Sequence, residues 1–148
     1  MKSLPLLIIV ADRGHVRAFR TNEDGHLQQI DAEEIPEGRE TLSETVTDQA
    51  GAFRSKGQLG ASTAENLHLQ EDLESKNLQH VAAVIRGVLD QHPGWWGFAA
   101  PAEFNDRLLQ LVGEAQQGRL SMNLTKDLSH HPVREIESHF RNAAEGQV

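Results

Sequence analysis

The chain has 148 residues, a formal net charge of −8 and no cysteine. This length suits one domain with its own hydrophobic core, and the missing cysteine excludes disulfides, thiol nucleophiles and cysteine-ligated metal centres. The negative charge argues against a broad nucleic-acid-binding surface. The N-terminal apolar run is too short to cross a bilayer and lacks a cleavage site, so we expect a cytoplasmic protein without a membrane partner.

Three strands are predicted in the first third of the chain. Residues 6–11 form a continuous apolar run, which is typical of a strand buried on both faces. Residues 15–21 alternate between two faces, and residues 27–35 have Leu27 and Ile30 as apolar anchors. The short turns between these runs favour an antiparallel arrangement.

Residues 36–61 show no regular period and contain few apolar side chains. A structureless segment of about 25 residues is uncommon inside a compact domain and is usually functional or disordered. We therefore expect a long loop here, either functional or flexible.

Helices and strands alternate in the rest of the chain. Ser62 to Glu65 has the form of a capping box and predicts the start of a long helix, which ends at His92-Pro93-Gly94. The later predicted elements are a strand over 95–100, a helix from Pro101, a strand over 119–125 and a helix from Pro132. The order β-β-β-α-β-α-β-α predicts a single α/β domain, residues 1–148, with a ribonuclease H-like mixed sheet.

Acidic side chains supply the first candidates for a site. Asp12 follows the first predicted strand, where an architecture of this kind begins a carboxylate cluster for two divalent ions. Glu71 or Glu74 of the long helix would supply a second carboxylate, but the fourth strand is followed by no acid before Glu103. The alternative is that Asp12 caps a turn and the helix acids face solvent.

Histidines offer a second option, because His130 and His131 stand together before the last helix. Adjacent histidines rarely reach one metal ion, and the chain lacks the usual spacing of histidine ligands. The alternative is that His131 contacts the start of that helix. These residues are the candidates for a metal site, and the sequence predicts no cofactor.

The third candidate is the tip of the 36–61 loop. Residues 21–50 contain nine acids and one base, whereas Arg54 and Lys56 follow close together with Gly57 and Gln58. Arginine and lysine on a glycine-containing loop suit contact with a phosphate backbone, and glutamine both donates and accepts hydrogen bonds. The alternative is a disordered surface loop whose charges keep it soluble.

Several segments together resemble a known family. They are Val10–Phe19, Pro36–Arg39, Asp48–Phe53, Ala100–Phe104, Leu108–Leu109 and Lys126–Ser129. In this order and spacing the chain resembles the bacterial host-attachment proteins, described as proteins required for attachment to host cells. That family is similar to the middle domain of archaeal and eukaryotic peptide-chain release factors, so the resemblance implies a ribonuclease H-like fold.

The loop gives this resemblance a functional meaning. In release factors, the loop between the third strand and the long helix carries Gly-Gly-Gln, which positions water for ester hydrolysis. At the same place this chain has Lys56-Gly57-Gln58. Since Lys replaces the first Gly, the resemblance implies a non-catalytic or weakly catalytic partner of the ribosome, tRNA or another RNA. Arg54, Lys56, Gly57 and Gln58 would make the contact, and Gln58 is a catalytic candidate beside Asp12.

Two other hypotheses stay open. One is a protein-interaction module or homo-oligomer, suggested by Trp95-Trp96 in a predicted strand. Strand alternation would turn one of these tryptophans inward and the other outward. The second is a divalent-metal nuclease that uses Asp12 and the helix carboxylates.

Overall fold

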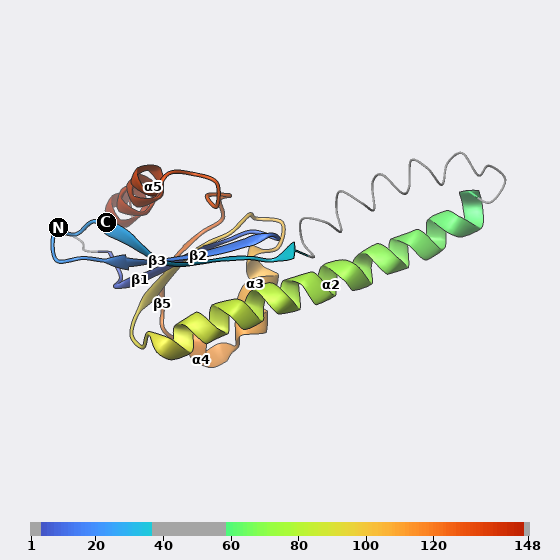
Figure 1. The fold of residues 1–148 in the computed structure, drawn as a ribbon, viewed down its shortest axis with the longest axis horizontal. Coiled ribbons are helices and arrows are strands. Elements are labelled where there is room, and N and C mark those ends of the chain that lie inside the picture. The colour runs from blue at the N-terminus through green and yellow to red at the C-terminus, as the bar shows by residue number, and fades with distance from the viewer. Residues whose placement is uncertain (1–3, 37–58, 147–148) are drawn as a thin grey trace.

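The computed structural model describes residues 4–36 and 59–146, with side chains assigned for 4–36 and 71–144. Figure 1 shows the arrangement of the helices and strands. In chain order they are β1 (Leu7–Ala11), β2 (His15–Thr21), β3 (Leu27–Glu34), α2 (Leu59–Gln91), β4 (Trp96–Ala99), α3 (Asn105–Val112), α4 (Glu114–Gln117), β5 (Leu120–Leu124) and α5 (Val133–Gly146).

The five strands form one mixed sheet in the order β3-β2-β1-β4-β5. The first three strands are antiparallel neighbours, whereas β4 is parallel to both β1 and β5. This arrangement confirms the predicted mixed α/β class, and the element order differs from the predicted one only by the short helix α4. Among the described residues, no helix combines the length and apolar character needed to cross a membrane.

Both faces of the sheet are covered by helices. In Figure 1, α5 lies on one side of the sheet, and α2, α3 and α4 lie on the other. The central strand β1 is therefore buried on both faces, as its continuous apolar run predicts. Leu7 and Ile9 pack in the core beneath α2 and α3, whereas Ile8 and Val10 pack in the core beneath α5.

The long helix begins earlier than its sequence predicts. Helix α2 starts at Leu59, so its first residues fall within the segment expected to be a loop. Leu59 and Ala61 have high helix propensity and Gly60 between them has low propensity, so the local sequence permits a helix N-terminal to Ser62 without requiring it. Residues 37–58 lie outside the described residues, and with them the loop-tip residues Arg54, Lys56, Gly57 and Gln58.

Two other local predictions were wrong. Ile30 is 39% exposed rather than an anchor. It lies at an irregularity of the β2–β3 pairing, where Ala18 pairs with Asp31 and Phe19 with Gln29, so Ile30 is an extra residue in β3. The helix expected from Pro101 begins at Asn105 and ends at Val112. Gly113 follows with φ of 101°, a conformation that glycine adopts freely, and it separates α3 from α4.

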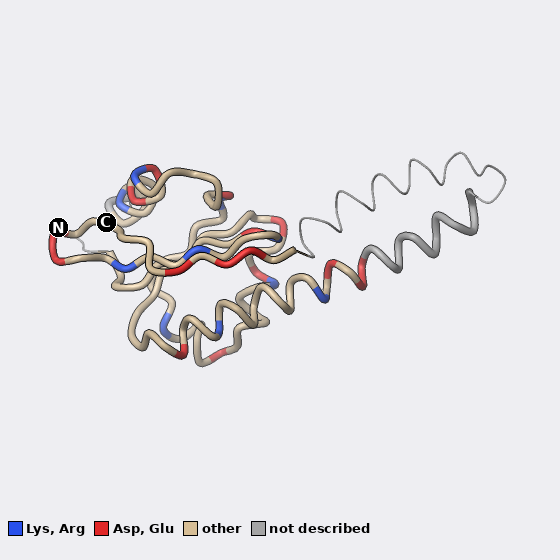
Figure 2. Tube along the Cα trace, in the orientation of Figure 1, with Lys and Arg blue, Asp and Glu red and all other residues tan. Residues whose placement is uncertain are grey.

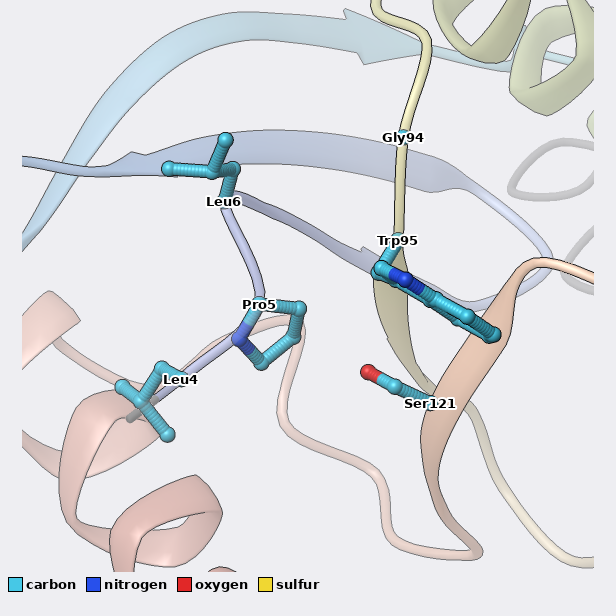
Figure 3. A pocket seen from close by; sticks show the side chains of 6 residues that line it. All are labelled: Leu4, Pro5, Leu6, Gly94, Trp95 and Ser121. Carbon is cyan, nitrogen blue, oxygen red and sulfur yellow. The ribbon is translucent and has the colours of Figure 1, made fainter. Parts of the chain in front are cut away.

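The tryptophan pair follows the predicted alternation. Trp96 is fully buried, and its indole Nε1 donates to the Gln116 carbonyl oxygen at 2.7 Å. Trp95 is 62% exposed. Figure 3 shows it beside an open pocket at the amino ends of β1 and β4, with Pro5 and Leu6 on the other side.

Candidate functional site

The parallel strands bring two distant segments of the chain to one edge of the sheet. Strands β1 and β5 both run parallel to β4, so their carboxyl ends lie at the same edge. Asp12 directly follows β1, and residues 125–132 connect β5 to α5. In open α/β sheets this edge is where ligands usually bind.

The turn after β1 fixes the position of the Asp12 carboxylate. Asp12 Oδ1 accepts a hydrogen bond from the Gly14 amide at 2.7 Å, and the Asp12 amide donates to the His15 carbonyl oxygen at 2.9 Å. Asp12 therefore caps a turn, which is one of the two roles that the sequence left open. The same geometry brings the start of β2 back beside the end of β1.

Two imidazoles converge on this carboxylate. His15 Nδ1 lies 3.2 Å from Asp12 Oδ1, and His130 Nε2 lies 3.3 Å from Asp12 Oδ2. The two rings also meet edge to face, with their centroids 4.9 Å apart. One potential ligand atom from each residue lies within 4.8 Å of the others, and no other such group of three occurs among the described residues.

The second oxygen of Asp12 is held by the loop that carries His130. Ser129 Oγ donates to Asp12 Oδ2 and also lies 3.2 Å from Asp127 Oδ1. Partial burial raises the pKa of Asp12, but the hydrogen bonds from Ser129 and Gly14 and the neighbouring His15 outweigh this effect. The net pKa is below its usual range, so the carboxylate is ionised at neutral pH.

The helix acids occupy a different place. Glu74 Oε1 lies 2.7 Å from Arg13 Nη2, and the same Arg13 nitrogen lies 3.6 Å from Glu103 Oε2. Glu71 is exposed. The group of potential ligands around Asp12 therefore has no second carboxylate from the described side chains of α2.

The adjacent histidine His131 does not join the site. Its Nδ1 lies 2.8 Å from Glu135 Oε2, and its ring meets that of His139 with centroids 5.9 Å apart. His131 is therefore directed toward α5, as expected for neighbouring histidines that cannot share one ion. Of the two histidine candidates, the structure brings only His130 to Asp12.

Sequence reasoning missed His15 and Ser129 as members of this site. His15 is the first residue of β2, and in the sequence it belongs to an alternating strand pattern that does not indicate a ligand-binding residue. The parallel pairing of β1, β4 and β5 could have identified the site, because it places the residues after β1 and those after β5 at the same edge of the sheet. Gln58 and the other loop-tip candidates lie outside the described residues.

A family model described as "Protein required for attachment to host cells" matches residues 7–140, which include Asp12, His15 and His130. A search of curated proteins finds no match.

Proposed function

Because the chain belongs to the family of proteins required for attachment to host cells, we propose that its role in that family depends on a bound divalent transition-metal ion. Asp12, His15 and His130 would hold the ion. The observation that carries this proposal is the convergence of two imidazole nitrogens and one carboxylate oxygen within 4.8 Å.

The distances suit an ion after a small adjustment. Bonds of about 2.1 Å to a tetrahedral metal place the ligand atoms about 3.4 Å from one another. The two contacts of Asp12, 3.2 Å from Oδ1 to His15 and 3.3 Å from Oδ2 to His130, are close to this spacing. Because they use different carboxylate oxygens, an ion held through a single oxygen requires one imidazole to move toward it. The His130 side chain is 68% exposed, so its ring has room to complete the approach.

The ligand types select the class of ion. Imidazole with carboxylate suits zinc, manganese, iron or cobalt, whereas magnesium and calcium prefer an all-oxygen environment. Three protein ligands leave at least one coordination position for water or for an oxygen of a substrate. An ion with such an open position supplies Lewis-acid chemistry, either by polarising a phosphoryl or carbonyl oxygen or by activating water.

Calorimetric titration with zinc, cobalt, manganese and magnesium tests the proposal. We expect one tight site for a transition metal and at least about tenfold weaker binding in Asp12→Asn, His15→Gln and His130→Gln. His131→Gln is the matched control, because it removes a neighbouring histidine that is directed toward Glu135. Equal losses in the His130 and His131 variants would indicate adventitious surface binding and contradict the proposal.

The nuclease hypothesis is a narrower version of the same proposal. It is tested by manganese-dependent cleavage of RNA and DNA, with Asp12→Asn as the inactive variant. Unchanged cleavage in that variant would reject a nuclease centred on Asp12. The pairing of Glu74 with Arg13 argues for a site with one carboxylate rather than a carboxylate cluster.

A second proposed function is contact with the ribosome, tRNA or another RNA through residues 36–61. Its support is the sequence, in which the Arg54 and Lys56 pair follows a strongly acidic stretch. Ribosome co-sedimentation at low salt tests it, with the double variant Arg54→Ala/Lys56→Ala beside the wild type. We expect the wild type to sediment with ribosomes and the variant to remain in solution; equal behaviour of the two would reject it.

A further inference from the structure

Arg17 of β2 is bonded to the loop that carries His130. Its Nη1 donates to the carbonyl oxygen of Ser129 at 2.9 Å and to that of His131 at 2.8 Å. These carbonyl groups belong to the residues directly before and after His130. One guanidinium nitrogen therefore fixes the backbone on both sides of a single side chain.

The guanidinium group is itself held in place by the sheet. Its Nε donates to Gln29 Oε1 of β3 at 3.0 Å, and its central carbon lies 5.0 Å from the centroid of the Phe19 ring. Contacts with an amide, an aromatic ring and two carbonyl groups restrict the rotamers of a long side chain. Arg17 therefore acts as a rigid link between β2 and the loop after β5.

The exposed His130 depends on such a link. Its side chain is 68% exposed, although its ring meets His15 edge to face and its Nε2 approaches Asp12. The path of the backbone places the ring where it can make these contacts. Leu128, two residues earlier in the loop, is buried beneath α5 and anchors the backbone there. The exposed ring of His130 is not buried in the core and does not anchor the loop in this way.

We propose that Arg17 is a positioning residue for the Asp12–His15–His130 site. By bonding both flanking carbonyl groups, it keeps the His130 imidazole directed at Asp12 and next to His15. This inference rests on the proposed metal-binding function but concerns the assembly of the site rather than its ligands. A simple structural role for Arg17 is the competing explanation.

A double-mutant cycle on metal affinity separates these explanations. We expect Arg17→Gln to weaken zinc or cobalt binding by about 10- to 100-fold, as is typical when a group that orients a ligand is removed. In a His130→Gln background the same change should have almost no further effect. Equal losses in both backgrounds, or no loss in either, would overturn the inference.

Two further variants sharpen the cycle. Arg17→Lys keeps the charge but replaces the planar fork with a single ammonium group, so we expect partial recovery of affinity relative to Arg17→Gln. Arg20→Gln is the matched control, because Arg20 is an exposed arginine of the same strand. It should bind metal as the wild type does, and a loss equal to that of Arg17→Gln would overturn the inference.

A measurement on the metal-free protein tests the positioning role of Arg17 separately from the proposed metal binding. The rings of His15 and His130 are close enough for a nuclear Overhauser effect between their protons. We expect this signal in the wild type and in Arg20→Gln and its loss in Arg17→Gln. If the wild type binds no metal but the signal follows this pattern, the metal proposal fails and the positioning role stands. A signal that persists in Arg17→Gln overturns the positioning role whatever the metal affinity.

Discussion

Single side chains connect parts of this chain that are far apart in sequence. The hydrogen bond from Ser129 to Asp12 spans 117 positions and joins the loop after β5 to the end of β1. Glu137 makes a similar connection from α5, since its Oε1 accepts from the Leu27 amide at 2.8 Å. Its other oxygen lies 3.0 Å from His26 Nδ1 and 3.1 Å from Arg141 Nε. One carboxylate therefore anchors α5 to the start of the edge strand β3.

The environment of Glu137 predicts a pH-dependent contribution to stability. Burial raises its pKa, but the Leu27 amide, His26 and Arg141 outweigh this and lower it below the ordinary value of 4.5. A carboxyl group with a lower pKa in the folded state stabilises the fold fully above its unfolded-state pKa. That stability is lost as the pH falls through the folded-state pKa.

We therefore expect Glu137→Gln to lower the free energy of unfolding at pH 7 by about 1–2 kcal/mol, because a hydrogen bond to a charged group contributes about 1.5–3 kcal/mol and exposed ion pairs contribute less. The difference from the wild type should shrink as the pH falls below 4.5. Urea unfolding at pH 7 and at pH values below 4.5 measures both effects. Glu135→Gln serves as the control, because its side chain is more exposed. A difference that stays constant with pH would contradict the assigned cause.

At the scale of elements, each strand was predictable to within one residue at either end, because each is an apolar or alternating run between turn signals. The start of α2 and the division between α3 and α4 could not be predicted, because they depend on weak local conformational preferences. The position of Asp12 at the end of a buried strand was predictable, because the apolar run of β1 ends directly before it. Its meeting with His130 was not, because sheet pairing rather than local sequence brings them together.

The close packing of β4 against α5 gives a prediction for glycine. A methyl group at Gly97 would lie 3.1 Å from Pro5, 3.3 Å from Phe140 and 3.4 Å from Ile8. These distances are tighter than ordinary van der Waals contact, so the core must shift to accommodate alanine. We expect Gly97→Ala to destabilise the protein by about 1–3 kcal/mol, as other overpacked cores do.

Gly87 provides the matched control on a helix. A methyl group added at this position of α2 would meet no atom within 4 Å, so Gly87→Ala should instead stabilise the protein by about 0.5–1 kcal/mol. Thermal unfolding of the two variants should give melting temperatures that move in opposite directions. A rise in both would show that packing around Gly97 does not limit the side chain.

At the scale of the whole molecule, three surfaces with different properties surround one sheet. The Asp12 site lies at the carboxyl ends of the parallel strands, and the pocket beside Trp95 lies at their amino ends (Figure 3). Figure 2 shows acidic residues along the edge strand β3 and in the turn before it. These acidic side chains are a second place where a cation could bind, but among the described residues only Asp12, His15 and His130 bring three potential ligands together.

Metal binding should therefore stabilise the whole fold through this one site. An ion held by Asp12, His15 and His130 links the β1–β2 turn to the loop after β5, and both links are lost on unfolding. At a free zinc concentration 100 times its dissociation constant, the expected gain is about 2.7 kcal/mol, or roughly 5–10 °C in melting temperature. Differential scanning calorimetry, with each protein compared with its own metal-free form, measures the gain.

The pattern across variants distinguishes this site from diffuse binding to acidic surfaces. Asp12→Asn and His130→Gln should show a smaller zinc-dependent rise in melting temperature, because binding at least about tenfold weaker reduces the gain to about 1.4 kcal/mol or less. His131→Gln should rise as the wild type does. Magnesium should produce little change in any of them, because it prefers oxygen ligands. A chelator should reverse the rise, since the ion stabilises only the state that binds it. A rise in Asp12→Asn equal to that of the wild type would place the stabilising ion elsewhere, and with it the functional site.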